Sequence, residues 1–270
     1  MPRLTLFAKG NVDLHDTLHS CRVGGEMLWN GINEVLRASH PDTLIRIRHE
    51  TWTRSDALLE ATGAPPAELS ELNLPLGMYP ATSQFSTALF ETTADIIALS
   101  IQPDVATGLV RHQAGGFLLY PYGLHGWTEP ERMWLEKNCV RAAPLTCDEM
   151  VNNFITIIER IRQTTDAPIL VFNMSPIIPG ETIHCFQGLG EALSTRVRRF
   201  NLGLIEVSDV TGVSIIDVDT IIARVGADAH KLDAVHLMPT GYRLIAEEVV
   251  RVLTDLGILE AKSEVACAAA

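Results

Sequence analysis

Apolar residues along this 270-residue chain alternate between short runs and longer segments with helical spacing. The short runs predict strands that are buried on both faces, because such strands read as nearly unbroken apolar stretches. They cover residues 4–8, 44–48, 95–101, 168–174 and 213–218. Helical spacing recurs over residues 27–36, 150–161, 189–207 and 239–253. Strands separated by helices indicate a parallel sheet covered on both faces, and therefore an α/β fold.

Local signals mark the ends of several predicted elements. Thr146 and Glu149 form a capping-box pattern ahead of the helix over 150–161, Gly212 ends the long helix, and Pro239 begins the terminal one. No linker or repeat divides the chain, so we expect one domain over residues 1–259. Residues 260–270 are rich in small side chains and predict a frayed tail.

Composition narrows the range of functions. A formal net charge of −12 disfavours binding to nucleic acid or to an anionic membrane. No apolar stretch approaches the roughly 18 residues of a membrane span, and the N-terminal segment has no signal-peptide pattern. The five cysteines are scattered without a CxxC pair. We therefore expect a cytoplasmic protein whose partner is a small-molecule substrate.

Ligands of open parallel sheets bind at the carboxyl ends of the strands, so the residues that follow each predicted strand are the first candidates. The first strand runs into residues 10–19, where two Asp and two His fall within seven residues. In a helix, His15 and His19 would share one face. The segment predicts a proton-handling cluster, a divalent metal site of His15, His19 and one Asp, or simple helix capping by Asp13.

Polar residues also follow the third and fourth strands. Gln102 is placed either to donate an amide N–H to a developing negative charge or to form an ordinary polar turn. Asn173 and Ser175 flank the exit of the fourth strand, and Ser175 before Pro176 favours turn chemistry over a nucleophile.

The segment before the terminal helix places Asp233 three residues ahead of His236. A carboxylate at this spacing can set the tilt and tautomer of an imidazole, the side chain best suited to moving protons near neutral pH. We predict His236 as a general base and Asp233 as the residue that orients it. The alternative is a capping Asp beside a packed His.

Taken in order, these segments resemble the SGNH (GDSL-like) hydrolase superfamily. The closest match is the last block, Asp233-Ala234-Val235-His236-Leu237, followed by Gly241 and Tyr242. Gly10-Asn11 and Asp104 stand in the first and third blocks. The resemblance implies a flavodoxin-like three-layer α/β/α sandwich, acyl hydrolysis or transfer, and no cofactor. It also implies a Ser nucleophile activated by the His, with an oxyanion hole from the Ser and Gly N–H groups and an Asn side chain.

The chain departs from this pattern at three places. Val12 occupies the nucleophile position, no glycine lies between Pro41 and Gly63, and residues 101–104 have neither the Gly nor the Asn of the third block. An apolar side chain supplies no hydroxyl, so ordinary Ser chemistry is not available at position 12. The chain is therefore predicted to be a divergent member of the superfamily.

Three alternatives follow. In the first, His236 activates water or a substrate group, assisted by the residues of the first-strand segment. In the second, the pocket binds a ligand or partner protein without catalysis. In the third, a metal at Asp13, His15 and His19 polarises the substrate. The predicted catalytic residues are His236, Asp233, Asp13 and His15. The predicted substrate-binding residues are Gly10, Asn11, His19, Gln102, Asn173 and Arg111.

Residues 106–144 interrupt the strand–helix alternation and are rich in aromatic side chains. One interpretation is a lid in which Arg111 meets a substrate carboxylate or phosphate. The other is a covering subdomain or a surface for homo-oligomer formation.

Overall fold

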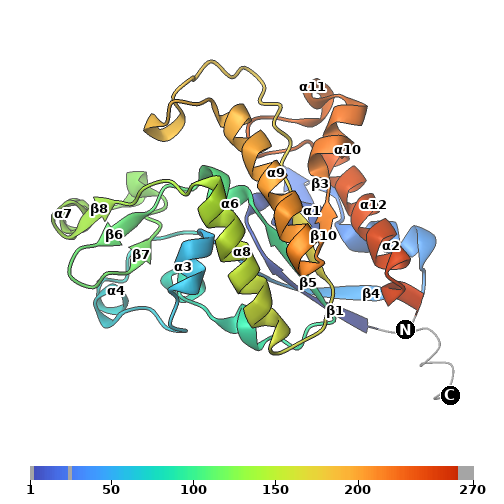
Figure 1. Ribbon diagram of the computed structural model, residues 1–270, viewed down its shortest axis with the longest axis horizontal. Coiled ribbons are helices and arrows are strands. Elements are labelled where there is room, and N and C mark those ends of the chain that lie inside the picture. The colour runs from blue at the N-terminus through green and yellow to red at the C-terminus, as the bar shows by residue number, and fades with distance from the viewer. Residues whose placement is uncertain (1–2, 24–25, 261–270) are drawn as a thin grey trace.

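The computed structural model describes residues 3–23 and 26–260, and its centre is a five-stranded parallel sheet between two layers of helices (Figure 1). The strands lie in the order β10 (Ser214–Ile216), β9 (Ile169–Phe172), β5 (Ile96–Ser100), β1 (Arg3–Lys9) and β4 (Leu44–Glu50). Numbered along the chain, this is the flavodoxin-like order 2-1-3-4-5, read from the other edge. The predicted three-layer α/β/α fold is confirmed.

The two faces of the sheet contact different helices, because successive side chains of a strand point to opposite sides. Leu6 of β1 and Ala98 of β5 belong to the core beneath α2 and α12, whereas Phe7 and Ile97 belong to the core beneath α8 and α9. Both faces are therefore apolar, which explains the unbroken runs in the sequence. The helices on the first side are α1 (Val12–Leu18), α2 (Ile32–Ser39), α10 (Val218–Val225) and α12 (Pro239–Asp255). Those on the second side are α3 (Ser55–Leu59), α8 (Cys147–Arg162) and α9 (Leu193–Thr211).

The chain order reverses between β1 and β5, which are hydrogen-bonded neighbours although α1, α2 and β4 separate them in sequence. Such a switch point leaves a crevice at the carboxyl ends of the two strands, and ligands of this fold class bind there. The structure places Gly10 and Ser100 at this position, directly after or at the ends of β1 and β5.

Residues 27–36 depart from the helix that their spacing predicts. An antiparallel pair of strands, β2 (Cys21–Val23) and β3 (Glu26–Trp29), comes first, and α2 begins only at Ile32. Met27 and Leu28 are exposed at 44% and 45%, so their apolar character does not report burial. The long helix likewise begins at Leu193 rather than 189 and continues to Thr211. The predicted tail lies almost wholly outside the described residues.

The aromatic-rich segment 106–144 forms a small subdomain. Strands β6 (Val110–His112), β7 (Leu118–Leu119) and β8 (Cys139–Arg141) make an antiparallel sheet beside α7 (Glu129–Asn138). With α4 (Ala67–Leu72) it encloses its own core, in which Trp127 is 3% exposed. Figure 1 places this subdomain on the side of the molecule away from α10, α11 and α12. Its aromatic side chains fill a core, which favours the covering subdomain over the lid.

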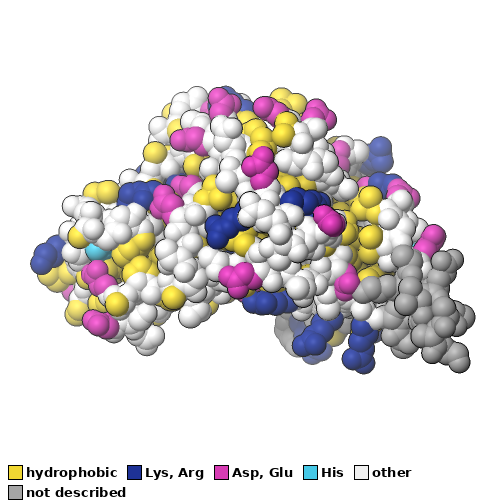
Figure 2. All heavy atoms as spheres, turned by 60° about the horizontal axis from the view of Figure 1, so that its bottom comes forward, with side chains coloured by type: hydrophobic (Ala, Val, Ile, Leu, Met, Phe, Trp, Pro, Cys, Tyr) yellow, Lys and Arg dark blue, Asp and Glu magenta, His cyan; other side chains and the backbone are white. Residues whose placement is uncertain are grey.

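The remaining short helices are α5 (Ala81–Gln84), α6 (Gln102–Ala106), α11 (Ala227–His230), and the 3₁₀ turns Ala88–Glu91, Leu124–Gly126 and Phe186–Gly188. Within the described ranges, no helix combines the length and apolar character that crossing a bilayer requires. On the face shown in Figure 2, acidic and basic side chains are interspersed among apolar ones.

Gly31, the residue before α2, is a position where only glycine fits. Its φ is +76°, and a Cβ there would lie 2.5 Å from the carbonyl oxygen of Leu18. We expect Gly31→Ala to lower the free energy of unfolding by about 1–3 kcal/mol or more, as urea denaturation would measure. Gly190→Ala is the control, because a Cβ at Gly190 meets nothing within 4 Å. Equal effects of the two substitutions would contradict the prediction.

Candidate functional site

The loop before α12 holds His236 against Asp233. The Nδ1 of His236 lies 2.8 Å from Oδ2 and 3.0 Å from Oδ1 of Asp233, and the backbone N–H groups of Val235 and His236 both donate to Oδ1 at 2.8 Å. Partial burial alone would raise the pKa of Asp233, but these donors outweigh it and hold the pKa below its ordinary value. The carboxylate is therefore ionised at neutral pH and fixes Nδ1–H. Nothing in the described part of the chain hydrogen-bonds Nε2 of His236.

Backbone contacts close this loop into a defined shape. Lys231 and Leu237 form an isolated antiparallel bridge, and Met238 N donates to the carbonyl of His230 at 2.8 Å. The buried hydroxyl of Tyr242 accepts a hydrogen bond from Leu237 N at 3.0 Å. At Gly241 a Cβ would lie 3.1 Å from the His230 carbonyl oxygen. Gly241 and Tyr242, the last residues of the matched block, thus hold the loop that carries His236.

A cavity of about 30 Å³ joins this loop to the first-strand segment. Its walls include Asp13 and Thr17 of α1 and, from the loop, Ala234, Val235 and Leu237. Gln102, Asn173, Ser175 and Lys231 also line it. The loop and the acidic first-strand segment therefore meet at one edge of the sheet, at the switch point. The side chains of His236, His15 and His19 do not line the cavity.

Asp13 turns its carboxylate toward the end of β5. Its Oδ2 hydrogen-bonds the Ser100 hydroxyl, which also accepts from Gln102 N at 3.0 Å. The residue as a whole is half-buried, but Oδ1 is enclosed and has no hydrogen-bond partner. Burial raises the pKa of Asp13, and the hydrogen bond with Ser100 opposes that rise only in part.

Lys231 is a buried cation that the sequence patterns did not single out. It is 6% exposed, and its Nζ donates to the carbonyl of Ser175 at 3.0 Å. Burial lowers the pKa of Lys231 to about 8, against the opposing charges of Asp233 and Asp219. This cation therefore lies within the electrostatic reach of the carboxylate that orients His236.

Three histidines form a separate cluster at the ends of β1 and β4. The ring centroids of His15 and His19 lie 5.0 Å apart, and His49 lies 5.5 Å and 5.9 Å from them. Burial lowers the pKa of His49 to about 4, with further contributions from His15 and His19. His49 was missed because its place beside Ala8 depends on strand pairing. Its position at the end of a predicted strand was the available signal.

The sequence also left open a metal site at Asp13, His15 and His19. In the ranges 3–23 and 26–260, no group of three or more His, Cys, Asp or Glu side chains is arranged to hold a metal ion. Nδ1 of His15 hydrogen-bonds Asp16 at 2.7 Å, and Asp13 turns to Ser100 instead. The arrangement of these side chains lends no support to the metal-assisted alternative.

Tyr242 connects the histidine cluster with the His236 loop. Its hydroxyl hydrogen-bonds Asp16, the residue that also binds His15, and accepts from the backbone of Leu237. Because Leu237 follows His236, the two histidine-bearing segments share a hydrogen-bonded link although their imidazoles do not touch. His15 and His19 are therefore neighbours of the site rather than part of its wall.

Three further predicted residues have structural contacts. Gly10 permits the close start of α1, because a Cβ there would lie 2.4 Å from Leu14 Cδ1. Asn11 accepts a hydrogen bond from Trp52 N at 3.3 Å. Asn173 donates to Asp217 Oδ1 at 2.8 Å and accepts from Asp219 N at 3.1 Å. Both ends of the Asn173 amide are thus occupied by protein groups, although the residue lines the cavity.

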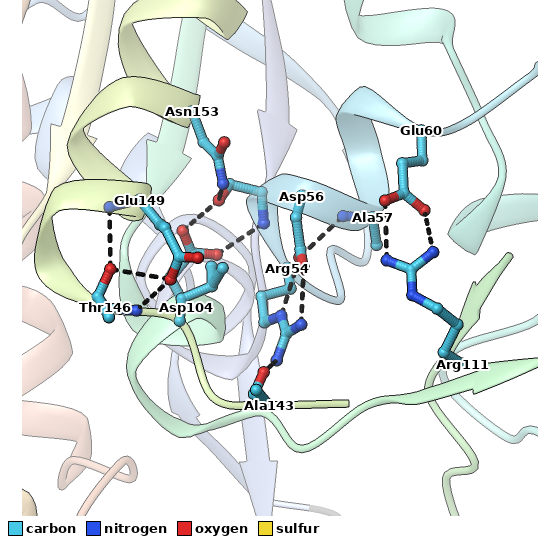
Figure 3. Close-up of polar contacts among 12 residues, drawn as sticks. Arg54, Asp56, Ala57, Glu60, Asp104, Arg111, Ala143, Thr146, Glu149 and Asn153 are labelled. Carbon is cyan, nitrogen blue, oxygen red and sulfur yellow. Dashed lines mark hydrogen bonds and ion pairs between the residues drawn. The ribbon is translucent and has the colours of Figure 1, made fainter. Parts of the chain in front are cut away.

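Arg111 is a correction to the predicted site. It lies on β6 in the small subdomain, and its guanidinium binds both carboxylate oxygens of Glu60 at 3.0 and 2.9 Å (Figure 3). Its carboxylate partner is therefore supplied by the chain itself, and Arg111 does not line the cavity at the switch point. The sequence could not show this, because Glu60 is 51 residues away.

Asp104, at the position of the third block, is a buried carboxyl group in a polar network (Figure 3). Ser55 donates to it from its backbone N at 2.7 Å and from its hydroxyl at 2.5 Å, and Asn153 donates to the same hydroxyl at 3.0 Å. Burial raises the pKa of Asp104 to about 7. The contacts tie the end of β5 to the start of α3, which is a positioning function rather than contact with a ligand.

Several solved structures have a similar fold over nearly the whole chain. AlAXEase, described as an acetyl xylan esterase, aligns with a TM-score of 0.50 at 10% identity, covering 93% of this chain and 100% of that one. An acetylxylan esterase from Geobacillus stearothermophilus aligns with a TM-score of 0.48 at 13% identity, covering 92% and 93%. A lipolytic G-D-S-L family protein from Veillonella parvula DSM 2008 aligns with a TM-score of 0.46 at 12% identity, covering 94% and 99%.

The chain shares the three-layer α/β/α fold of the acetyl xylan esterase AlAXEase, as the resemblance in the sequence implied. The strand order and the alignment over nearly the whole chain carry this assignment. No family model and no curated protein matches the sequence. Identity this low shows the fold alone, so the chemistry must come from the residues. Val12, which the sequence comparison placed at the expected nucleophile position, is half-buried at the start of α1.

Proposed function

We propose that this protein is a divergent SGNH-type hydrolase or acyl-transfer enzyme that acts on a small molecule without a Ser nucleophile at position 12. The observation that carries the proposal is the contact between His236 and Asp233. An ionised carboxylate, itself held by two backbone N–H groups, fixes Nδ1 of a partly exposed imidazole. Val235 and Leu237, on either side of His236, line the switch-point cavity. An imidazole held in this way can act as a general base, because Nε2 can accept a proton from a bound substrate or water.

The proposed reaction uses groups that the chain holds. Nε2 of His236 takes a proton from water or from a substrate hydroxyl or amine as that oxygen or nitrogen forms a bond to an acyl carbon. The acyl carbon then releases its leaving group, which receives the proton from His236. Asp233 stabilises the imidazolium formed between the two steps without itself gaining a proton. Atoms and charge balance with water or a substrate nucleophile as the only co-reactant.

His236→Ala tests this function. A screen of short acyl esters is the assay, beginning with acetyl esters because AlAXEase is described as an acetyl xylan esterase. We expect the rate with the best ester to fall by about 10²–10⁴-fold, the usual contribution of a positioned general base. His230→Ala is the matched control, because His230 ends the neighbouring helix α11 and its ring hydrogen-bonds Thr240.

The binding-only alternative predicts a different outcome. Val12, which removes the hydroxyl of the SGNH pattern, favours that alternative. If wild type and His236→Ala are equally inactive on every ester tested, the enzyme proposal is wrong and the fold serves binding. Equal, non-zero activity in wild type and His236→Ala would also overturn the assignment of His236.

A further inference from the structure

Three buried polar atoms without hydrogen-bond partners lie on residues that line the switch-point cavity. They are Oδ1 of Asp13, Oε1 of Gln102 and Oγ of Ser175. Gln102 is 5% exposed and Ser175 is 3% exposed, so water outside the protein does not satisfy them. Buried polar atoms are nearly always paired, and leaving one unpaired is costly. Their gathering around one cavity indicates a place for a hydrogen-bonding group.

The chemistry of the three atoms indicates what kind of group this is. A carboxylate oxygen and an amide oxygen only accept hydrogen bonds, and a hydroxyl oxygen can accept as well. The missing group must therefore supply several donors. An ammonium group has three N–H donors and a charge opposite to that of the Asp13 carboxylate, which makes each bond stronger. A cavity of about 30 Å³ admits a head group of this size and little more.

Part of the remaining wall is apolar and would contact the carbon that bears the head group. Phe172, Val218 and Ile245 contribute apolar surface beside the polar atoms. Lys231 also lines the cavity, but its Nζ is bound to the carbonyl of Ser175, and the carboxylates of Asp219 and Asp233 offset its charge. Among the described residues, no basic side chain hydrogen-bonds Asp13, whose side-chain partner is the hydroxyl of Ser100. The anionic form of Asp13 thus lacks a cation.

We propose that this cavity binds the ammonium group of an aliphatic primary amine, and that the substrate of His236 carries such a group. The first part stands on the cavity alone, whereas the second rests on the proposed function. Val235 and Leu237, which flank His236, both line the cavity. A head group held there leaves the remainder of the molecule beside the imidazole. The substrate class is therefore an amine-bearing acyl compound or an amine acyl acceptor.

Calorimetric titration of the full-length protein with ethylammonium chloride tests the binding. We expect saturable binding, and none with tetramethylammonium chloride at the same ionic strength, because that cation has no N–H donor. Asp13→Asn, which keeps the shape of the side chain and removes its charge, should raise the dissociation constant for ethylammonium at least tenfold. Ser175→Ala and Gln102→Leu should also raise the dissociation constant for ethylammonium. They keep the inference testable if Asp13→Asn does not fold.

Several results would overturn the inference. They are the absence of ethylammonium binding to wild type, equal binding of tetramethylammonium, and unchanged binding in folded cavity variants. A crystal structure from ethylammonium chloride that showed only water in the cavity would also overturn the inference. His236→Ala separates the two proposals because His236 does not line the cavity. Retained amine binding without His236-dependent activity rejects the proposed function alone, and His236-dependent activity without amine binding rejects only the amine site.

Discussion

Asp233→Asn is expected to lower kcat by about 10²–10⁴-fold while KM stays within a few-fold. The carboxylate binds Nδ1–H of His236 with one oxygen at 2.8 Å and accepts two backbone N–H groups with the other. An Asn can keep the backbone contacts with its carbonyl oxygen but then presents NH₂ to the imidazole. The ring must then turn or change tautomer, so Nε2 carries the proton and no longer acts as a base.

The double variant shows whether the two residues act as a unit. If Asp233 acts only through His236, Asp233→Asn combined with His236→Ala should be no slower than His236→Ala alone. Asp228→Asn is the control for removing one negative charge, because Asp228 is exposed on the adjoining helix α11. If Asp233→Asn lowered the melting temperature so far that the protein was partly unfolded under the assay conditions, the loss of rate would point to a merely structural role. Full additivity in the double variant would also contradict the orienting role.

The layers of the fold followed from the sequence because both faces of the sheet are buried. Side chains such as Leu6 and Phe7 point to opposite cores, so the strands appear as continuous apolar runs between helical segments. The hairpin before α2 was missed because exposed Met27 and Leu28 happen to continue the helical spacing. Apolar identity and burial are not the same property, and only the three-dimensional contacts separate them.

The edge of the sheet at which the candidate site lies could also be predicted, but not all of the residues that form it. The rule that ligands bind at strand carboxyl ends brought Asp13, Gln102 and the His236 loop to one place, and the cavity walls include all three segments. Lys231 and His49 were missed because burial and strand pairing, rather than local spacing, bring them there. Residues separated widely in sequence leave no short-range signal.

Gln102 and Asp104, the two polar residues compared above with the third block, have different surroundings. Gln102 stands at the cavity, but Asp104 lies in the core at 2% exposure, bound to Ser55 at the start of α3. The start of α3 is thereby fixed to α6, the helix that follows β5, by a carboxyl group. We expect the contact between α6 and α3 to depend on the protonation state of Asp104.

Asp104→Asn is expected to change how stability depends on pH. Burial raises the pKa of Asp104 from 3.8 to about 7, so between these values the folded protein keeps a proton that the unfolded chain releases. The stabilising contribution of the group is complete below pH 3.8 and is lost as pH rises toward 7. The amide of Asn stays neutral across this pH range, and its carbonyl oxygen can still accept from Ser55 N.

The free energy of unfolding of Asp104→Asn, relative to wild type, should therefore increase by about 4 kcal/mol between pH 4 and pH 8. Urea denaturation at several pH values measures this difference directly. Asp209→Asn, on the exposed face of α9, is the control and should show only a small change. A difference that stays constant across the range would show that Asp104 ionises in the folded protein as it does in the unfolded chain. Its contacts with Ser55 would then be those of a buried carboxylate rather than of a neutral acid.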